Sequence, residues 1–281
     1  MPRRAQTALT AALATLAALS LVYLAAVHLG PVRWLDASVL DGFASLDGPR
    51  VRPIASFIAH LCNPDHYVWF VAGLVTVALL RRRRRTALAV FAVLIGSGLT
   101  THLLKPALAT PRHSPLLENL GQINASSWPS GHATAAMAIA LCAILVAPQR
   151  LRPWVAALGA VFAVAVTFSF LVLAWHFPSD VVGGFLVATT WTLFAVAGLA
   201  WAQERWPRSV SSSPSVPLRA ALAPPVVTTV SAGLVALLVL LARPAQVVSY
   251  AQEHTAFVLG AGMIAAAALA LAAGVSTLLR R

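Results

Sequence analysis

The stretch RRRRRTALAVFAVLIGSGLTTHLLKPAL, residues 81–108, contains the pattern that decides the fold. Five consecutive arginines, Arg81 to Arg85, precede a mostly apolar run at 86–108. A helix that crosses a bilayer needs about 20 apolar residues, and this run meets that length. The arginines therefore predict a turn at one membrane surface, and the apolar run predicts a membrane span.

The rest of the chain has the same character. Of its 281 residues, 59% are hydrophobic and 10% are charged, and the mean hydropathy is +0.81. These values lie outside the range of soluble globular domains. A soluble domain with a single anchor is also excluded, because apolar runs recur along the whole length and no long polar block is present. The composition predicts an all-α, polytopic membrane bundle.

Eight apolar stretches are candidates for membrane spans. The second is short and follows a segment, 53–65, that we expect to be an amphipathic helix along the interface. The first follows Arg3 and Arg4, as in a signal peptide, but it is long and lacks a small-residue cleavage pattern, so we expect a retained helix. The predicted spans are 8–29, 66–80, 86–108, 132–147, 154–174, 180–202, 220–242 and 255–278.

Arginines and acidic residues fall in alternate loops, which predicts the orientation. Short loops rich in Arg and Lys stay on the cytoplasmic side. We therefore expect a multi-pass protein of the plasma membrane with both termini in the cytoplasm, and Glu204 is the one acidic residue among the arginines. The predicted cytoplasmic set is Arg3, Arg4, Arg81 to Arg85, Arg150, Arg152, Arg205, Arg208, Arg219, Arg280 and Arg281, and the opposite set is Asp36, Asp41, Asp47, Asp65, Glu118, Asp180 and Glu253.

The net charge of +12 follows from this topology and from attraction to anionic lipids of the inner leaflet. We expect membrane lipids as partners and no nucleic acid, because the Arg81 to Arg85 run is a tight turn between two apolar helices. Cys62 and Cys142 are expected in different environments, so neither a disulfide nor a metal cluster is predicted. The oligomeric state is left open.

A polar segment divides the predicted chain into parts. Residues 203–219 contain five serines and three prolines between apolar runs and predict a cytoplasmic linker. The linker separates a six-span catalytic unit, 1–202, from a two-span C-terminal helix pair, 220–281, in which no chemistry is expected.

Candidate functional residues concentrate in two outward loops. The first contains Lys105, Arg112 and the sequence Trp128-Pro129-Ser130-Gly131-His132 at the start of the fourth span. The second reads Trp175-His176-Phe177-Pro178-Ser179-Asp180 and opens the sixth span. Each loop ends at a helix N-terminus, where unpaired N–H groups and the helix dipole favour an anion such as phosphate.

These side chains suit phosphoryl transfer without a metal, which needs cations, a nucleophile and an acid. Lys105 and Arg112 can neutralise phosphoryl oxygens, and Ser130 and Gly131 can add a hydroxyl and backbone N–H groups. His176 precedes a carboxylate, Asp180, by four residues, so that one ring nitrogen can be fixed while the other attacks phosphorus. His132 has no such partner nearby in sequence and is the candidate general acid.

Three elements in this order resemble the type 2 phosphatidic acid phosphatase (PAP2) superfamily over about 33–202: Lys105-x6-Arg112, Pro129-Ser130-Gly131-His132 and His176-x3-Asp180. The resemblance implies a six-helix core, shared with soluble haloperoxidases. It also implies removal of phosphate from a lipid phosphate or polyprenyl or lipid diphosphate through a phosphohistidine, without a metal or other cofactor. The implied roles are His176 as nucleophile, Asp180 as its orienting group, His132 as acid, and Lys105, Arg112, Ser130 and Gly131 as phosphate-binding residues.

The chain departs from the family pattern at two positions. His113 follows Arg112 where the family usually has Pro, and Phe170 stands where the third motif normally has Arg. Loss of one preorganised donor costs about 3 kcal/mol of transition-state stabilisation. Groups available to replace the cation are Arg33, Arg50, Arg52, Arg243 and His113. Two alternatives to a hydrolase are therefore kept, namely a lipid phosphotransferase that uses the same histidine and a catalytically weak binding or scaffold protein with this fold.

Overall fold

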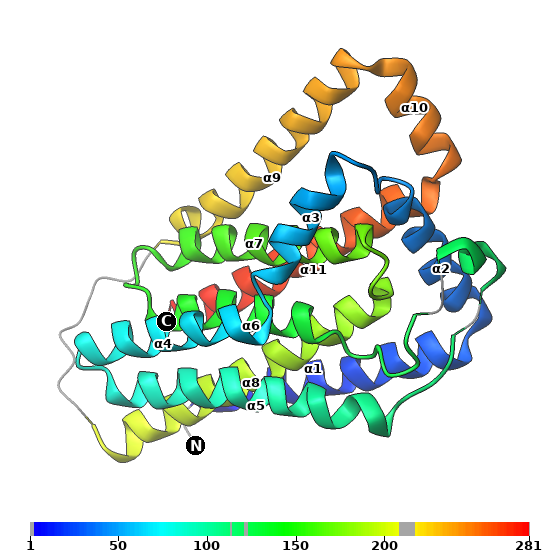
Figure 1. The fold of residues 1–281 in the computed structure, drawn as a ribbon. Coiled ribbons are helices and arrows are strands. Elements are labelled where there is room, and N and C mark those ends of the chain that lie inside the picture. Colours follow the sequence, from blue (N-terminus) through cyan, green and yellow to red (C-terminus); the bar gives the residue numbers. More distant parts are fainter. Residues whose placement is uncertain (1–2, 113, 121–122, 208–216, 281) are drawn as a thin grey trace.

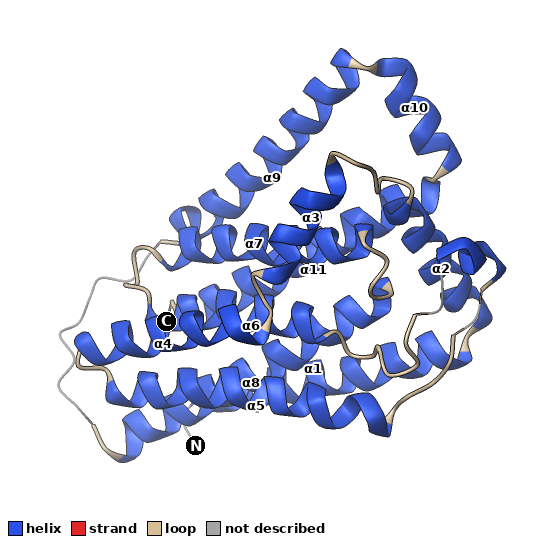
Figure 2. Cartoon of the chain, in the orientation of Figure 1, coloured by secondary structure: helices blue, strands red, loops and turns tan. Residues whose placement is uncertain are grey.

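A computed structural model of the chain describes residues 3–112, 114–120, 123–207 and 217–280. Within these ranges the chain forms eleven α-helices and one short 3-10 helix, and it has no strand (Figure 2). The elements in chain order are α1 (Arg3–His28), α2 (Gly30–Ala44), α3 (Val51–His60), α4 (Pro64–Leu80), α5 (Arg84–Ala107), η1 (Pro115–Leu120), α6 (Gly131–Val146), α7 (Arg152–Val172), α8 (Pro178–Arg205), α9 (Leu218–Ala242), α10 (Pro244–Glu253) and α11 (Thr255–Leu278).

Each of the eight predicted spans corresponds to one helix. By length and composition, α1, α5, α7, α8, α9 and α11 can cross a membrane, and α4 and α6 are shorter apolar helices. The predicted all-α, polytopic membrane bundle is confirmed. A separate short helix, α3, occupies most of the segment expected to be amphipathic. Helices α2 and α10 were not expected from the sequence, because each is short and lies between longer apolar runs.

Helix α8 packs against α1, α5, α6 and α11, and its apolar window is the most buried of the six candidate spans (Figure 1). Two glycines near its N-terminus permit a close approach by the segment that precedes α6. A Cβ atom at Gly183 would lie 2.9 Å from the Trp128 indole, and one at Gly184 would lie 2.6 Å from the Ser130 carbonyl oxygen. Because such contacts are too short for any side chain, glycine is needed at both positions.

Arginines at one end of the bundle donate hydrogen bonds to the carbonyl ends of neighbouring helices. The last carbonyl groups of an α-helix have no partner within the helix, and a cation there also complements the helix dipole. Both termini lie at this end, on the left in Figure 1. The bonds run from Arg81 to Val146 at 3.0 Å, from Arg85 to Ala202 at 3.0 Å and Trp206 at 2.9 Å, and from Arg152 to Leu279 at 2.7 Å.

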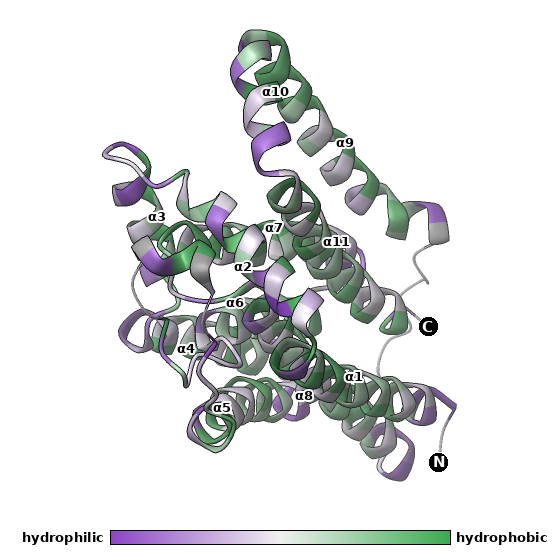
Figure 3. Cartoon of the chain, turned by 90° about the vertical axis from the view of Figure 1, so that its right-hand side faces the viewer, coloured by the Kyte–Doolittle hydropathy of each residue, from purple (hydrophilic) through white to green (hydrophobic). Residues whose placement is uncertain are grey.

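The C-terminal helices differ in how they pack. Helix α9 diverges from the bundle, and none of its most apolar window is buried (Figure 1). Most of the α9 ribbon has the green of hydrophobic residues in Figure 3. Helix α11 returns to the bundle and packs against α2, α7 and α8. Residues 208–216 of the predicted linker lie outside the described ranges, and the division into 1–202, 203–219 and 220–281 stays a prediction.

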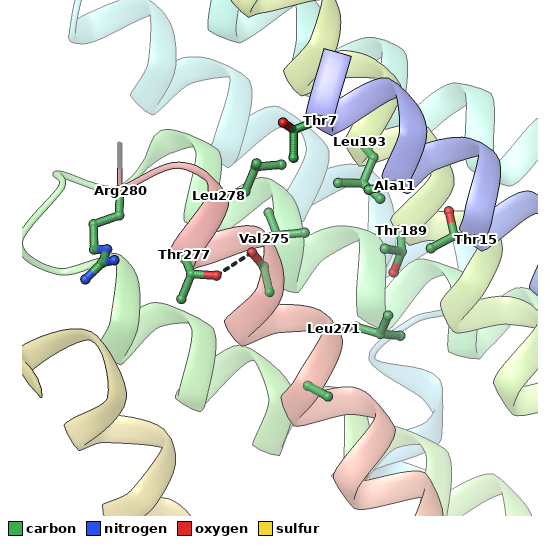
Figure 4. Close-up of a pocket in the computed structure, with 12 residues that line it drawn as sticks. Thr7, Ala11, Thr15, Thr189, Leu193, Leu271, Val275, Thr277, Leu278 and Arg280 are labelled. Carbon is green, nitrogen blue, oxygen red and sulfur yellow. Dashed lines mark hydrogen bonds between the residues drawn. The ribbon is translucent and has the colours of Figure 1, made fainter. Parts of the chain in front are cut away.

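A cavity of about 360 Å³ lies between α1, α8 and α11 near the two termini (Figure 4). Its lining includes Thr7, Thr189, Thr277, Leu271 and Arg280. The hydroxyls of Thr7, Thr189 and Thr277 already donate to backbone carbonyl groups of their own helices. This cavity lies at the arginine-rich end of the bundle, away from the predicted site.

Candidate active site

The first turn of α8 fixes the carboxylate of Asp180. Helix α8 begins at Pro178, a residue suited to the first helical position. Asp180 is fully buried, and its Oδ2 accepts a hydrogen bond from the backbone N–H of Phe177 at 3.0 Å. The Nδ1 atom of His176 lies 3.4 Å from the same oxygen. The four-residue spacing thus brings the imidazole and the carboxylate together.

Helix α6 begins at Gly131, directly after the buried Ser130. The Ser130 hydroxyl accepts a hydrogen bond from the N–H of Ala133 at 3.3 Å and so caps the helix. The N–H of Ser130 donates to the backbone carbonyl of Asp180 at 2.9 Å. This bond joins the starts of α6 and α8, and two helix N-termini that favour an anion lie next to each other.

The two histidines lie beside each other at this junction. The ring centroids of His132 and His176 are 6.5 Å apart. The Nε2 atom of His132 lies 2.9 Å from Oδ1 of Asn63, directly before α4. With the amide oriented in this way, Asn63 accepts and His132 Nε2 carries the proton. Asn63 is therefore a site residue that the sequence analysis did not assign, although the Asn63-Pro64 pair is a typical helix start.

Phe170 contacts both histidines. Its ring centroid lies 5.3 Å from that of His176 and 6.0 Å from that of His132, and its side chain is fully buried. Trp175 also lies near His132, with ring centroids 5.6 Å apart. At the position where the family pattern has a guanidinium, an apolar ring therefore packs against the two imidazoles.

Arg112 is buried, and both of its terminal nitrogens face acceptors of this chain. Nη1 donates to the Ser179 hydroxyl at 2.9 Å and lies 3.5 Å from Oδ2 of Asp36. Nη2 donates to the Ser127 hydroxyl at 2.8 Å and to Oδ1 of Asp180. The guanidinium also stacks over the ring of Phe177, 4.2 Å from its centroid. In this arrangement Arg112 orients Asp180.

Lys105 approaches the same helix junction from the end of α5. Its Nζ lies 4.0 Å from the position that a Cβ atom would take on Gly131. Lys105 and Gly131 line a cavity of about 290 Å³ between α4, α5 and α6, together with His132 and Tyr67. All seven residues predicted for the site are thus linked by short contacts at one end of the bundle, although their roles stay predictions.

Other charged groups that were candidates to replace the missing cation lie elsewhere. Arg33, Arg50, Arg52 and Arg243 are exposed, and Arg52 pairs with Asp47 at the surface. His113 lies outside the described residues. Within the described ranges, no three His, Cys, Asp or Glu side chains are grouped closely enough to hold a metal ion.

Comparison with protein families gives a match at residues 86–204, and the matching model is that of the PAP2 superfamily. Residues 86–204 thus match the PAP2 superfamily, as the sequence motifs predicted. Every residue predicted for the site, from Lys105 to Asp180, lies inside the matched segment. No curated protein sequence matches the chain.

The PAP2 fold extends beyond the matched segment. The chain superposes on the crystal structure described as the first transmembrane PAP2 type phosphatidylglycerolphosphate phosphatase from Bacillus subtilis, with a TM-score of 0.55. The likeness covers 70% of this chain and 98% of that chain, at 21% sequence identity. The two proteins therefore share the membrane PAP2 fold.

Two residues outside the matched segment, Asn63 and Asp36, reach this PAP2 site. Asp36 lies on α2 and accepts the N–H of Ser179 at 2.9 Å and the Ser179 hydroxyl. Burial raises the pKa of Asp36 to about 6, and the negative charge of Asp180 adds to this rise, whereas Ser179 and Arg112 oppose it. The charge pattern predicted Asp36 on the outward face, but its sequence context indicated no role, because Ser179 lies 143 residues away along the chain.

Proposed function

We propose that this PAP2 protein is an integral-membrane phosphohydrolase that removes phosphate from a lipid phosphate or from a polyprenyl or lipid diphosphate. The observation that carries the proposal is the placement of His176, whose Nδ1 faces Asp180 while its ring lies beside His132. An imidazole held at Nδ1 by a carboxylate presents Nε2 as a nucleophile.

In the proposed reaction, Nε2 of His176 attacks phosphorus and the bond from phosphorus to the lipid oxygen breaks. His132, as the doubly protonated imidazolium, gives a proton to the leaving oxygen, and Asp180 stabilises the charged imidazole of His176. His132 then takes a proton from water, which attacks the phosphohistidine. Inorganic phosphate leaves, and His176 returns to its starting state.

The phosphate is proposed to lie at the N-terminus of α6. Gly131 supplies a backbone N–H there, Ser130 supplies its hydroxyl, and Lys105 supplies a charge from α5. Arg112 contributes when one of its serine contacts exchanges for a phosphoryl oxygen. No step in this scheme uses a metal ion or other cofactor.

A lipid substrate is supported by the cavity beside Lys105 and His132. Apart from Cys62, its remaining lining comes from the apolar helices α4, α5 and α6, including Tyr67 and Thr101. A headgroup near Lys105 would leave the lipid chains among these helices. The proposed setting is the plasma membrane, with both termini cytoplasmic and the active site on the opposite face, as the arginine distribution predicts.

The proposal is tested by phosphate release from the purified protein in detergent with a chelator, over a panel of lipid phosphates and polyprenyl diphosphates. Replacing the nucleophile by His176→Ala should lower the rate by about 10⁴-fold or more. The matched control is His66→Ala, because the His66 side chain is exposed and pairs with Asp65 at the surface. Equal inactivity of the wild type and His176→Ala across the panel would remove the hydrolase proposal.

A further inference from the structure

Asp36 contacts residues of the PAP2 site, although it lies far from them in the sequence. It lies on α2, outside the matched segment, and its side chain is buried. Both carboxylate oxygens are occupied by Ser179, through the backbone N–H and the hydroxyl. Ser179 is the second residue of α8 and directly precedes Asp180. Asp36 thus holds the first turn of the helix that carries the orienting carboxylate.

Asp36 and Asp180 share one guanidinium. Nη1 of Arg112 lies 3.5 Å from Asp36, and Nη2 donates to Oδ1 of Asp180. This division leaves Oδ2 of Asp180 for the N–H of Phe177 and for Nδ1 of His176. A guanidinium without its second carboxylate would be free to turn and to compete with His176 for that oxygen.

We propose that Asp36 is a positioning residue for the phosphoryl-transfer site, which holds Arg112 and the start of α8 so that Asp180 keeps one oxygen for His176. The inference rests on the proposed function. Asp36 acts through Arg112, Ser179 and Asp180, and it does not touch the reacting atoms.

The C-terminal helices α10 and α11 pack against α2, the helix that carries Asp36. The Tyr250 hydroxyl of α10 donates to the carbonyl of Gly42, and Phe257 of α11 stacks edge-on against Phe43 with centroids 4.8 Å apart. A Cβ atom at Gly260 of α11 would lie 2.5 Å from Val39. The helix pair that carries no chemistry of its own thus supports the helix that carries Asp36.

The charged groups that face Asp36 are Arg112 from the loop after α5 and Asp180 from α8. Another acid on α2, Asp41, faces α11 instead, with its Oδ2 3.7 Å from Nδ1 of His254. Because the pKa of Asp36 lies at about 6, its carboxylate is charged at pH 7.5 and mostly neutral at pH 5. An Asp36→Asn variant therefore resembles the wild type at pH 5 and differs from it at pH 7.5.

The test compares kcat and KM of the wild type and Asp36→Asn between pH 5 and 8, with a lipid phosphate that the wild type hydrolyses. Above pH 7 the variant should lose about tenfold to a hundredfold in kcat with little change in KM, as for a misplaced reacting group. The loss should shrink toward none at pH 5. Asp47→Asn is the control, because Asp47 pairs with Arg52 at the surface, and it should follow the wild type throughout. A loss that is the same at every pH would mean a structural role only and would overturn the inference, as would no loss at all.

The support from α11 is tested by Gly260→Ala, which should lower kcat above pH 7 in the same way because Val39 must move. Gly262→Ala is its control, since a Cβ atom there has no atom within 4 Å. Equal rates for both variants would overturn the role of α11.

Thermal unfolding in detergent tests the burial of Asp36 without an activity measurement. The test can therefore be made even if no substrate is found. An aspartate has a pKa of about 3.9 when unfolded. The folded state then binds more protons between pH 4 and 6, and the contribution of Asp36 to stability is present below pH 4 and falls as pH rises through 6. The wild-type Tm minus the Asp36→Asn Tm should therefore decrease from pH 4 to 6.5. A Tm difference that stays constant or rises with pH would contradict the buried position of Asp36. Inactivity of the wild type would instead count only against the proposed hydrolase function.

Discussion

The ring of Phe170 lies edge-on to the imidazole of His176, with centroids 5.3 Å apart and planes at 72°. An apolar side chain thus occupies the position beside the proposed nucleophile where the family pattern has a cation. Phe170 supplies no charge for a phosphoryl oxygen, and Lys105 and Arg112 are the Lys and Arg side chains that the described part of the chain brings to the site.

Replacing Phe170 by Arg should raise kcat, because a preorganised cation near developing charge is worth about tenfold or more. The gain should come with a lower Tm, since the position is fully buried and the guanidinium lacks a partner without substrate. Steady-state kinetics and thermal unfolding of the same preparation measure both effects. Phe170→Leu keeps the site apolar and should show no gain. If Phe170→Arg shows no gain either, another group already supplies the cation.

His132→Ala should lower kcat by about 10²-fold to 10⁴-fold on lipid phosphates, the range for loss of general acid catalysis. Asn63→Ala should cause a smaller loss, because His132 keeps its ring but loses the acceptor that orients it. Both losses should shrink with an aryl phosphate whose leaving group needs no proton. Equal losses on both kinds of substrate would show that His132 is not the acid.

Gly184→Ala should lower the Tm and the activity together. The added Cβ would lie 2.6 Å from the Ser130 carbonyl oxygen, so that the starts of α6 and α8 must separate at a cost of about 1–3 kcal/mol. Gly198→Ala in the same helix is the control, because its Cβ meets no atom within 4 Å. We expect it to stabilise α8 by about 0.5–1 kcal/mol. Similar Tm values for the two variants would contradict the close packing at Gly184.

The local part of this arrangement was predictable from sequence, and the long-range part was not. The spans follow from apolar length, and the contact between His176 and Asp180 follows from a spacing of four residues at a helix start. Asn63 and Asp36 reach the site across 69 and 143 residues, respectively. Those contacts depend on how α2 and α4 pack against the core, which apolar periodicity does not determine.

The acceptors of Arg112 were missed for the same reason. Motif order placed Arg112 in the site as a phosphate-binding cation. Its burial between Asp36 and Asp180 becomes visible only when α2 is placed against the start of α8. The sequence likewise indicated that Phe170 replaces a cation, but it did not indicate that the ring would contact both histidines.

The most direct test of the central claim is a search for a phosphoryl group on His176 after rapid alkaline quenching of the enzyme during turnover of a lipid phosphate. Peptide mass spectrometry should find the phosphoryl group on His176 in the wild type, with more of it in His132→Ala if hydrolysis of the intermediate slows more than its formation. Turnover with no phosphoryl group at His176 at any quench time, or unchanged turnover by His176→Ala, would contradict the account.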